Sequence, residues 1–114
     1  MTPFRRGSVV LVPFPFTDLS AAKRRPALVV SSDDYNAVTE DVIIAQITSK
    51  LNSPRRPGDY RLNLYGEAGL PLPSLVRARM ATLHGTLIVK QLGTMPTAEM
   101  KAISRQLASA LGLP

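Results

Sequence analysis

Residues 23–30 read Lys23-Arg24-Arg25-Pro26-Ala27-Leu28-Val29-Val30, three cations and a proline followed by an apolar run. The apolar residues end at Val30 and are followed by Ser31, and this run predicts a buried strand over 28–31. Three cations at the beginning of a buried strand make a site for a phosphate, and Arg25 is the one closest to the strand. A rigid backbone there would aim its planar set of donors at an anion.

A second apolar run, over 42–47, ends in Thr48-Ser49 and predicts another strand with two hydroxyls at its end. If these two strands pair, the arginine at the beginning of one meets the hydroxyls at the end of the other. The simpler interpretations are a solvated basic turn for Arg25 and a hydroxyl that caps a turn for Thr48.

The remaining strand signals make the chain mainly β. Residues 9–12 are β-branched and apolar, and residues 59–64 alternate polar and apolar side chains. The pattern continues over 75–78 and 81–83, which brings the total to five or six strands. Two loops that carry cations, 17–24 and 50–58, separate them. By alternation, Arg77 shares a face with Arg79 and could reach water.

A helix is predicted at the end of the chain, because Met100, Ile103, Leu107 and Leu111 recur at helical spacing. Thr97 is the expected N-cap and Gly112 the residue that ends the helix. The apolar stripe is interpreted as core. Earlier in the chain, the segment 33–36 is interpreted as a turn or the start of a short helix.

Composition limits the class of protein. With 114 residues and 45% hydrophobic content, we expect a single domain over 1–114. A net charge of +6 attracts large anions, of which nucleic acid is the commonest. The chain has no cysteine, which suits a reducing cytoplasm. Pro13 and Pro15 interrupt the first apolar run, so we expect neither a signal peptide nor a membrane span.

The side chains available for catalysis are few, and they favour RNA over DNA. His84 is the only histidine, and adjacent carboxylates such as Asp33-Asp34 suit turns better than a metal site. DNA hydrolysis usually requires metal ions, whereas RNA carries its own attacking 2′-hydroxyl. In a ribonuclease, Arg25 would stabilise the charge that builds on the phosphate, and Thr48 would donate a hydrogen bond to it.

Several motifs in order resemble the PemK/MazF family of toxins from bacterial type II toxin-antitoxin systems. The resemblance runs nearly end to end, and no cofactor belongs to it. Its segments are Arg6-Gly7-Ser8-Val9-Val10-Leu11-Val12, Phe14-Pro15-Phe16-Thr17-Asp18, Arg24-Arg25-Pro26-Ala27-Leu28-Val29-Val30-Ser31-Ser32, Tyr35-Asn36, Ile44-Ala45-Gln46-Ile47-Thr48-Ser49, Gly69-Leu70, Pro73-Ser74-Leu75-Val76-Arg77, Thr82-Leu83 and Leu92-Gly93.

The resemblance implies a small SH3-like barrel with a C-terminal helix that forms a cytoplasmic homodimer. It also implies a metal-independent, sequence-selective endoribonuclease that cleaves single-stranded mRNA to a cyclic phosphate and a 5′-hydroxyl. A cognate antitoxin would cover the cationic groove. Arg25 and Thr48 match the family's catalytic arginine and threonine. The residues expected to bind RNA are Lys23, Arg24, Ser49, Arg77 and Arg79.

Two positions depart from the family pattern. Some members carry an acid two residues after the arginine that matches Arg77, and here that position is Arg79. The position after the Thr-Leu pair is His84, a candidate substitute proton carrier. Two other functions stay open: a non-catalytic toxin that binds DNA gyrase, as the similarly folded CcdB does, and an inert nucleic-acid-binding barrel.

Overall fold

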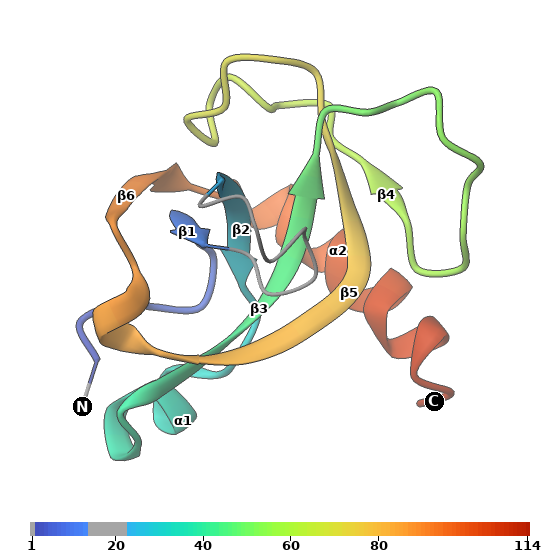
Figure 1. Ribbon diagram of the computed structural model, residues 1–114. Coiled ribbons are helices and arrows are strands. Elements are labelled where there is room, and N and C mark those ends of the chain that lie inside the picture. The colour runs from blue at the N-terminus through green and yellow to red at the C-terminus, as the bar shows by residue number, and fades with distance from the viewer. Residues whose placement is uncertain (1, 14–22) are drawn as a thin grey trace.

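The computed structural model describes residues 2–13 and 23–114, which form one antiparallel sheet and two α-helices. The predicted fold class, mainly β with a C-terminal helix, is confirmed. Figure 1 shows the sheet curled into a half-barrel, with the long strand β5 bent across it and α2 behind. The strands, β1 (Ser8–Pro13), β2 (Arg24–Val29), β3 (Asp41–Thr48), β4 (Tyr60–Arg61), β5 (Leu75–His84) and β6 (Lys90–Thr94), lie in the order β4-β5-β3-β2-β1-β6.

Both faces of the central strands are buried, which explains why their sequences are almost continuously apolar. On β1, Val9 belongs to the core between the sheet and α2 (Thr97–Ala110), while Val10 and Val12 belong to the core on the opposite face. Successive side chains of a strand point to opposite faces. Ile103 and Leu107 of α2 complete the first core.

The strand predictions differ from the structure in extent. Strand β2 begins at Arg24, four residues earlier than predicted, and β4 contains only Tyr60–Arg61 of the predicted 59–64. The two predicted segments 75–78 and 81–83 are one strand, β5, with a bulge opposite Ala45 and Gln46. Strand β6, which pairs with β1, was not predicted, because Lys90-Gln91-Leu92-Gly93-Thr94 has neither alternation nor β-branched residues before its end.

The helix predictions also differ from the structure in their bounds. The segment 33–36 does begin a short helix, α1 (Asp33–Val38), capped by the Ser32 hydroxyl. Helix α2 starts one residue earlier than predicted, because Pro96 is the N-cap and its carbonyl accepts the bond from Met100. Gly112 follows the helix with a positive φ of 72°, as predicted, but Leu111 is exposed and does not join the core stripe. Neither α-helix in the described part has the length and apolar character to cross a membrane.

A buried carboxylate explains why β4 is short. Glu99 on α2 is almost fully buried and accepts hydrogen bonds from the Tyr60 hydroxyl at 2.6 Å and from the backbone N–H groups of Asn63 at 2.7 Å and Leu64 at 3.1 Å. These two N–H groups are therefore directed to the helix and not to a strand ladder. The hydrogen bond to Glu99 raises the pKa of Tyr60. Glu99 thus fixes the beginning of the β4–β5 loop (62–74) against α2.

The β4–β5 loop is also held at the opposite edge of the sheet. A Cβ at Gly69 would lie 2.2 Å from the Leu92 carbonyl oxygen, and a Cβ at Gly93 would lie 2.4 Å from that of Ala68. Only glycine allows two backbones to approach so closely, and Gly69 also has a positive φ of 85°. The segment after the edge strand β4 therefore touches the other edge strand, β6, which keeps the sheet curled.

We expect Glu99→Ala to lower the free energy of unfolding by about 3 kcal/mol, because it leaves two backbone N–H groups and one hydroxyl without their acceptor. Tyr60→Phe removes only one of the three bonds and should cost about 1 kcal/mol. Urea denaturation measures both effects. The control is Glu67→Ala, an exposed acid of the same loop, which should change stability by less than about 0.5 kcal/mol. Equal effects of Glu99→Ala and Glu67→Ala would contradict this role.

Candidate functional site

The pairing of the central strands β2 and β3 ends at Ala27 and does not include Pro26, the preceding residue of β2. Their antiparallel register runs from Val29 opposite Ile44 to Ala27 opposite Gln46. Proline has no N–H to donate to a ladder, so pairing past Ala27 is disfavoured. If the register continued, it would place Arg25 opposite Thr48. The two residues that were predicted to converge therefore lie across the gap where the ladder ends.

A pocket of about 210 Å³ opens at this gap, and we call it the Arg25 pocket. One wall comes from the ends of β2 and β3, and the other comes from the β4–β5 loop that Glu99 and Gly69 hold in place. Arg25, Thr48 and Ser49 all line this pocket. The predicted proximity of the arginine to the two hydroxyls is therefore confirmed. The lining residues are Arg25, Pro26, Ile47, Thr48, Ser49, Leu70, Pro71, Leu72 and Ser74.

The polar groups around the Arg25 pocket are only partly satisfied. The Thr48 hydroxyl accepts a hydrogen bond from the Lys50 N–H at 3.1 Å, so it caps a turn, and its own hydrogen remains a donor. Among the described residues, the buried Nε of Arg25 and the buried Oε1 of Gln46 have no hydrogen-bond partner. The register places both side chains on one face of adjacent strands. A buried donor and acceptor without partners are costly, and a ligand can satisfy them.

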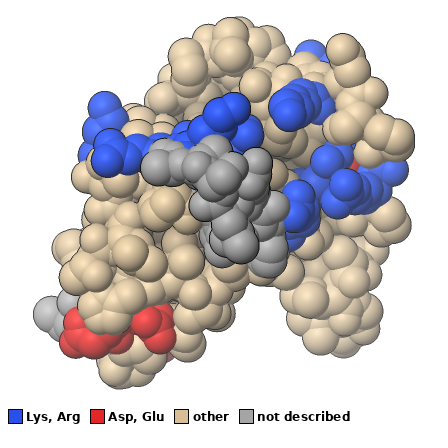
Figure 2. All heavy atoms as spheres, viewed as in Figure 1, with Lys and Arg blue, Asp and Glu red and all other residues tan. Residues whose placement is uncertain are grey.

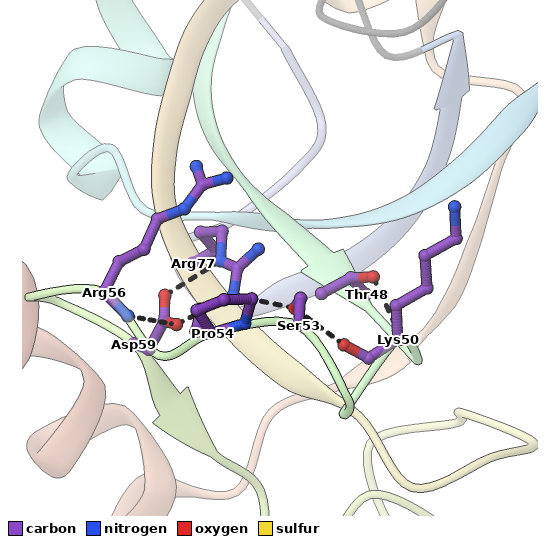
Figure 3. Close-up of polar contacts among 7 residues, drawn as sticks. All are labelled: Thr48, Lys50, Ser53, Pro54, Arg56, Asp59 and Arg77. Atoms are coloured by element: carbon purple, nitrogen blue, oxygen red, sulfur yellow. Dashed lines mark hydrogen bonds and ion pairs between the residues drawn. The ribbon is translucent and has the colours of Figure 1, made fainter.

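Arg77 lies outside the Arg25 pocket, in a buried ion pair with Asp59. Its Nε and Nη2 donate to the two carboxylate oxygens at 3.0 and 2.9 Å, and the side chains are only 8% and 3% exposed. Nη2 also reaches Ser53 Oγ at 3.2 Å and the Pro54 carbonyl at 3.4 Å (Figure 3). The expectation that Arg77 could reach water is therefore wrong. Its guanidinium holds the β3–β4 loop (49–59).

The ion pair shifts both pKa values. Burial favours the neutral form of the Asp59 carboxyl, but hydrogen bonds from the Arg77 guanidinium and the Arg56 N–H outweigh it, so the pKa of Asp59 lies below its usual value. The hydrogen bond from Asp59 likewise raises the pKa of Arg77. Both groups stay charged near neutral pH, and they neutralise each other.

The other predicted site residues lie at the rim of the site or away from it. Lys23 and Arg24 are exposed at the beginning of β2, beside Arg25. Arg79 lies in the bulge of β5, where residues 78 and 79 are extra, so the predicted alternation with Arg77 is interrupted. The loop predicted over 17–24 and the motif over 14–18 lie outside the described residues, apart from Lys23 and Arg24.

His84 is separated from the Arg25 pocket within one chain. It pairs with Asp41 at the beginning of β3, whereas Thr48 at the end of β3 pairs with Leu75. Seven residues of strand span roughly 23 Å. The Nδ1 of His84 instead lies 2.8 Å from the Thr86 hydroxyl and caps the short 3₁₀ turn Gly85–Leu87. The geometry of a single chain thus does not support His84 as a proton carrier in this pocket.

Charge is unevenly distributed over the face seen in Figure 2. Lys and Arg side chains form a band across its middle and upper part, whereas Asp and Glu gather at the lower left, where Figure 1 places α1. A band of one sign attracts a long polyanion before specific contacts form. The visible face is therefore suited to a negatively charged chain.

Comparison with known proteins agrees with this geometry. Residues 5–111 match the family model for the PemK-like, MazF-like toxin of type II toxin-antitoxin systems. The chain belongs to this family. It is 37% identical over 94 residues to endoribonuclease MazF2 of Mycobacterium bovis and to endoribonuclease MazF6 of Mycobacterium tuberculosis, covering 81% of this chain and 82% of each relative.

Solved structures show the same fold. A mycobacterial endoribonuclease in complex with its cognate antitoxin superposes with a TM-score of 0.78 at 28% identity, over 96% of both chains. MazF in a MazE-MazF complex from Deinococcus radiodurans gives a TM-score of 0.73 at 25% identity, over 100% of this chain and 99% of that one. The PemK/MazF resemblance seen in the sequence is confirmed.

Three contributors to the site were missed from the sequence. Asp59 was interpreted as the first residue of a strand, and no site role was predicted for Leu70 or Leu72 of the β4–β5 loop. Gln46 lies within an otherwise apolar strand, and no site role was predicted for it. A polar residue inside an otherwise apolar strand was the one available signal, because such a side chain needs a partner.

We expect Asp59→Asn to lower the free energy of unfolding by about 3 kcal/mol at pH 7, because it leaves the buried Arg77 charge unpaired. Since the pKa of Asp59 is lowered on folding, the pair contributes fully above about pH 4 and loses its contribution as the pH falls toward the folded value. The stability difference between wild type and variant should therefore shrink on acidification. Urea denaturation at pH 7 and pH 3 measures this, and a constant difference would contradict it.

Proposed function

We propose that this toxin is an endoribonuclease that cleaves single-stranded mRNA selectively by sequence and without a metal ion. The observation that carries the proposal is the Arg25 pocket, which brings a guanidinium and two hydroxyls together where the β2–β3 ladder ends. The relatives that match over four fifths of the chain are named endoribonucleases.

In the proposed reaction the 2′-oxygen attacks the adjacent phosphorus, and the bond from phosphorus to the 5′-oxygen breaks. The 2′-hydroxyl gives up a proton and the leaving oxygen takes one up, so the products are a cyclic phosphate and a 5′-hydroxyl. Arg25 stabilises the negative charge on the non-bridging oxygens, and the Thr48 hydroxyl donates a hydrogen bond to one of them. We assign Ser49, which also lines the pocket, to binding of the same phosphate.

A metal ion is not needed for this chemistry, since the attacking group is part of the substrate and the positive charge comes from arginine. In the described part of the chain, no group of three His, Asp or Glu side chains is arranged to hold a metal. Lys23, Arg24 and Arg79 would attract the RNA backbone on either side of the pocket.

Structures of two relatives support the choice of an antitoxin as partner. MazF of Deinococcus radiodurans was solved with MazE, and a mycobacterial relative was solved with its cognate antitoxin. We propose that this toxin likewise binds a cognate antitoxin, which would cover the cationic face, and that it acts as a homodimer in the bacterial cytoplasm. The gyrase-binding and inert-barrel alternatives have no comparable support, because the curated relatives that match are named endoribonucleases.

We expect the purified protein to cleave a long RNA in excess chelator and Arg25→Ala to lower kcat on the order of 100-fold. Thr48→Ala should have an effect of similar order, and Arg25→Lys an intermediate one, because lysine keeps the charge but loses the planar donors. Neither side chain fills the core, so the thermal midpoint should hardly change. Mapping the 5′ ends of the fragments and measuring single-turnover rates test both expectations.

The matched control is Lys101→Ala, which removes one positive charge from the exposed surface of α2 and should leave the rate within about twofold. A 2′-deoxy substitution at the mapped cleavage position should abolish cleavage there. RNA that stays intact at high protein concentration would refute the proposal, and normal cleavage by both site variants would refute the site.

A further inference from the structure

A second, larger hollow of about 610 Å³ adjoins the Arg25 pocket, and we call it the Lys50 hollow. The two share Ser49 and Leu72 in their linings, so they are neighbours along one surface. The volume is in the range of small-ligand sites. Its walls are the first part of the β3–β4 loop, 49–53, and Leu72 with Pro73 of the β4–β5 loop.

The side chains of the Lys50 hollow combine three kinds of chemistry. Leu51, Leu72 and Pro73 offer apolar surface, on which the face of a base can lie. The amide of Asn52 offers both donors and an acceptor, which can read the edge of a base. The ammonium of Lys50 is exposed and can pair with a phosphate. This set of groups is suited to a nucleotide.

The wall of the Lys50 hollow is connected by hydrogen bonds to the Arg77–Asp59 pair. Arg77 donates to Ser53 Oγ at 3.2 Å, and that hydroxyl donates to the Lys50 carbonyl at 3.0 Å. The Lys50 N–H in turn donates to Thr48 Oγ1 at 3.1 Å. Figure 3 shows this chain of contacts, from the ion pair through Ser53 to the end of β3.

The pair also fixes the far end of the loop. Asp59 accepts a hydrogen bond from the Arg56 N–H at 2.9 Å, and Arg77 reaches the Pro54 carbonyl. In Figure 3 the side chains of Lys50 and Arg56 extend away from the pair toward the same side. A loop tied at several points is preorganised, so binding costs less conformational entropy.

We propose that, if the protein cleaves RNA as proposed above, the Lys50 hollow binds the nucleotide next to the cleaved linkage and the Arg77–Asp59 pair positions its wall. Arg77 is then a positioning residue that determines which sequence is cut, not a group that touches RNA. The burial of the Arg77 side chain and its hydrogen bonds to Asp59, Ser53 and Pro54 support this role. A phosphate contact would need an accessible guanidinium whose charge is not already neutralised.

The first test alters the hollow itself. Asn52→Ala and Leu51→Ala are changes at the surface or near it, so both variants should fold. Cleavage is measured on a pool of RNAs that vary at the nucleotides flanking the mapped cut. We expect the preference at one flanking position to weaken about tenfold in each variant, while the other positions keep their ranking. Val38→Ala, a highly exposed apolar residue of α1, is the control and should leave the profile unchanged.

The second test separates positioning from direct contact. Arg77→Lys and Asp59→Asn should weaken the preference at the same flanking position as the hollow variants, with a larger change in KM than in kcat. If Arg77 instead contacted a phosphate, its replacement would weaken cleavage of all sequences equally. A uniform loss would overturn the positioning role. If the Asp59→Asn variant does not fold, the cleavage profile of Arg77→Lys alone distinguishes positioning from direct contact.

The failure of this inference is distinguishable from the failure of the proposed function. Wild-type protein that cuts no RNA refutes the function itself. A second outcome is that wild-type protein cuts RNA and that the Asn52→Ala and Leu51→Ala variants rank all sequences in the same order as wild type. This outcome refutes only the assignment of the Lys50 hollow as a nucleotide site.

Discussion

The end of the β2–β3 ladder is the constraint on which the site depends. The last pair of the two central strands is Ala27 with Gln46, and Pro26, which immediately precedes Ala27 in the chain, is left out of the pairing. Had the ladder continued, backbone hydrogen bonds would have closed the space that the Arg25 pocket occupies. The Arg-Pro dipeptide thus does two things in adjacent positions: proline ends the pairing, and arginine lines the opening that results.

Two buried carboxylates hold the loops that complete the site. Glu99 binds the beginning of the β4–β5 loop, and Asp59, which lies at the end of the β3–β4 loop, ties that loop to Arg77 of β5. Each one satisfies donors that would otherwise be buried without a partner. The chain has eight acidic residues against fourteen basic ones. Because these two acids act inside the protein, the net positive charge of the surface is available for an anionic partner.

Much of this arrangement could be predicted from the sequence, because its signals are local. The apolar runs around Leu28 and Ile44 predicted the central strands, and the residues at their ends predicted the meeting of Arg25 with Thr48. What could not be predicted depends on contacts between distant segments. Nothing near Glu99 indicates that it binds residues 35 to 39 positions earlier. Likewise, β6 has weak strand propensity and forms because β1 offers a free edge.

The Arg77–Asp59 pair changes how catalysis in this chain must be understood. Arg79 lies two residues after Arg77 and has no carboxylate to offer, and the carboxylate that binds Arg77 comes from the β3–β4 loop. A guanidinium held by both carboxylate oxygens at the bottom of a loop is poorly placed to exchange protons with RNA, and its raised pKa makes proton release still less favourable. This geometry supports the proposal that charge stabilisation rests on Arg25 and Thr48 and that Arg77 acts through the shape of the loop.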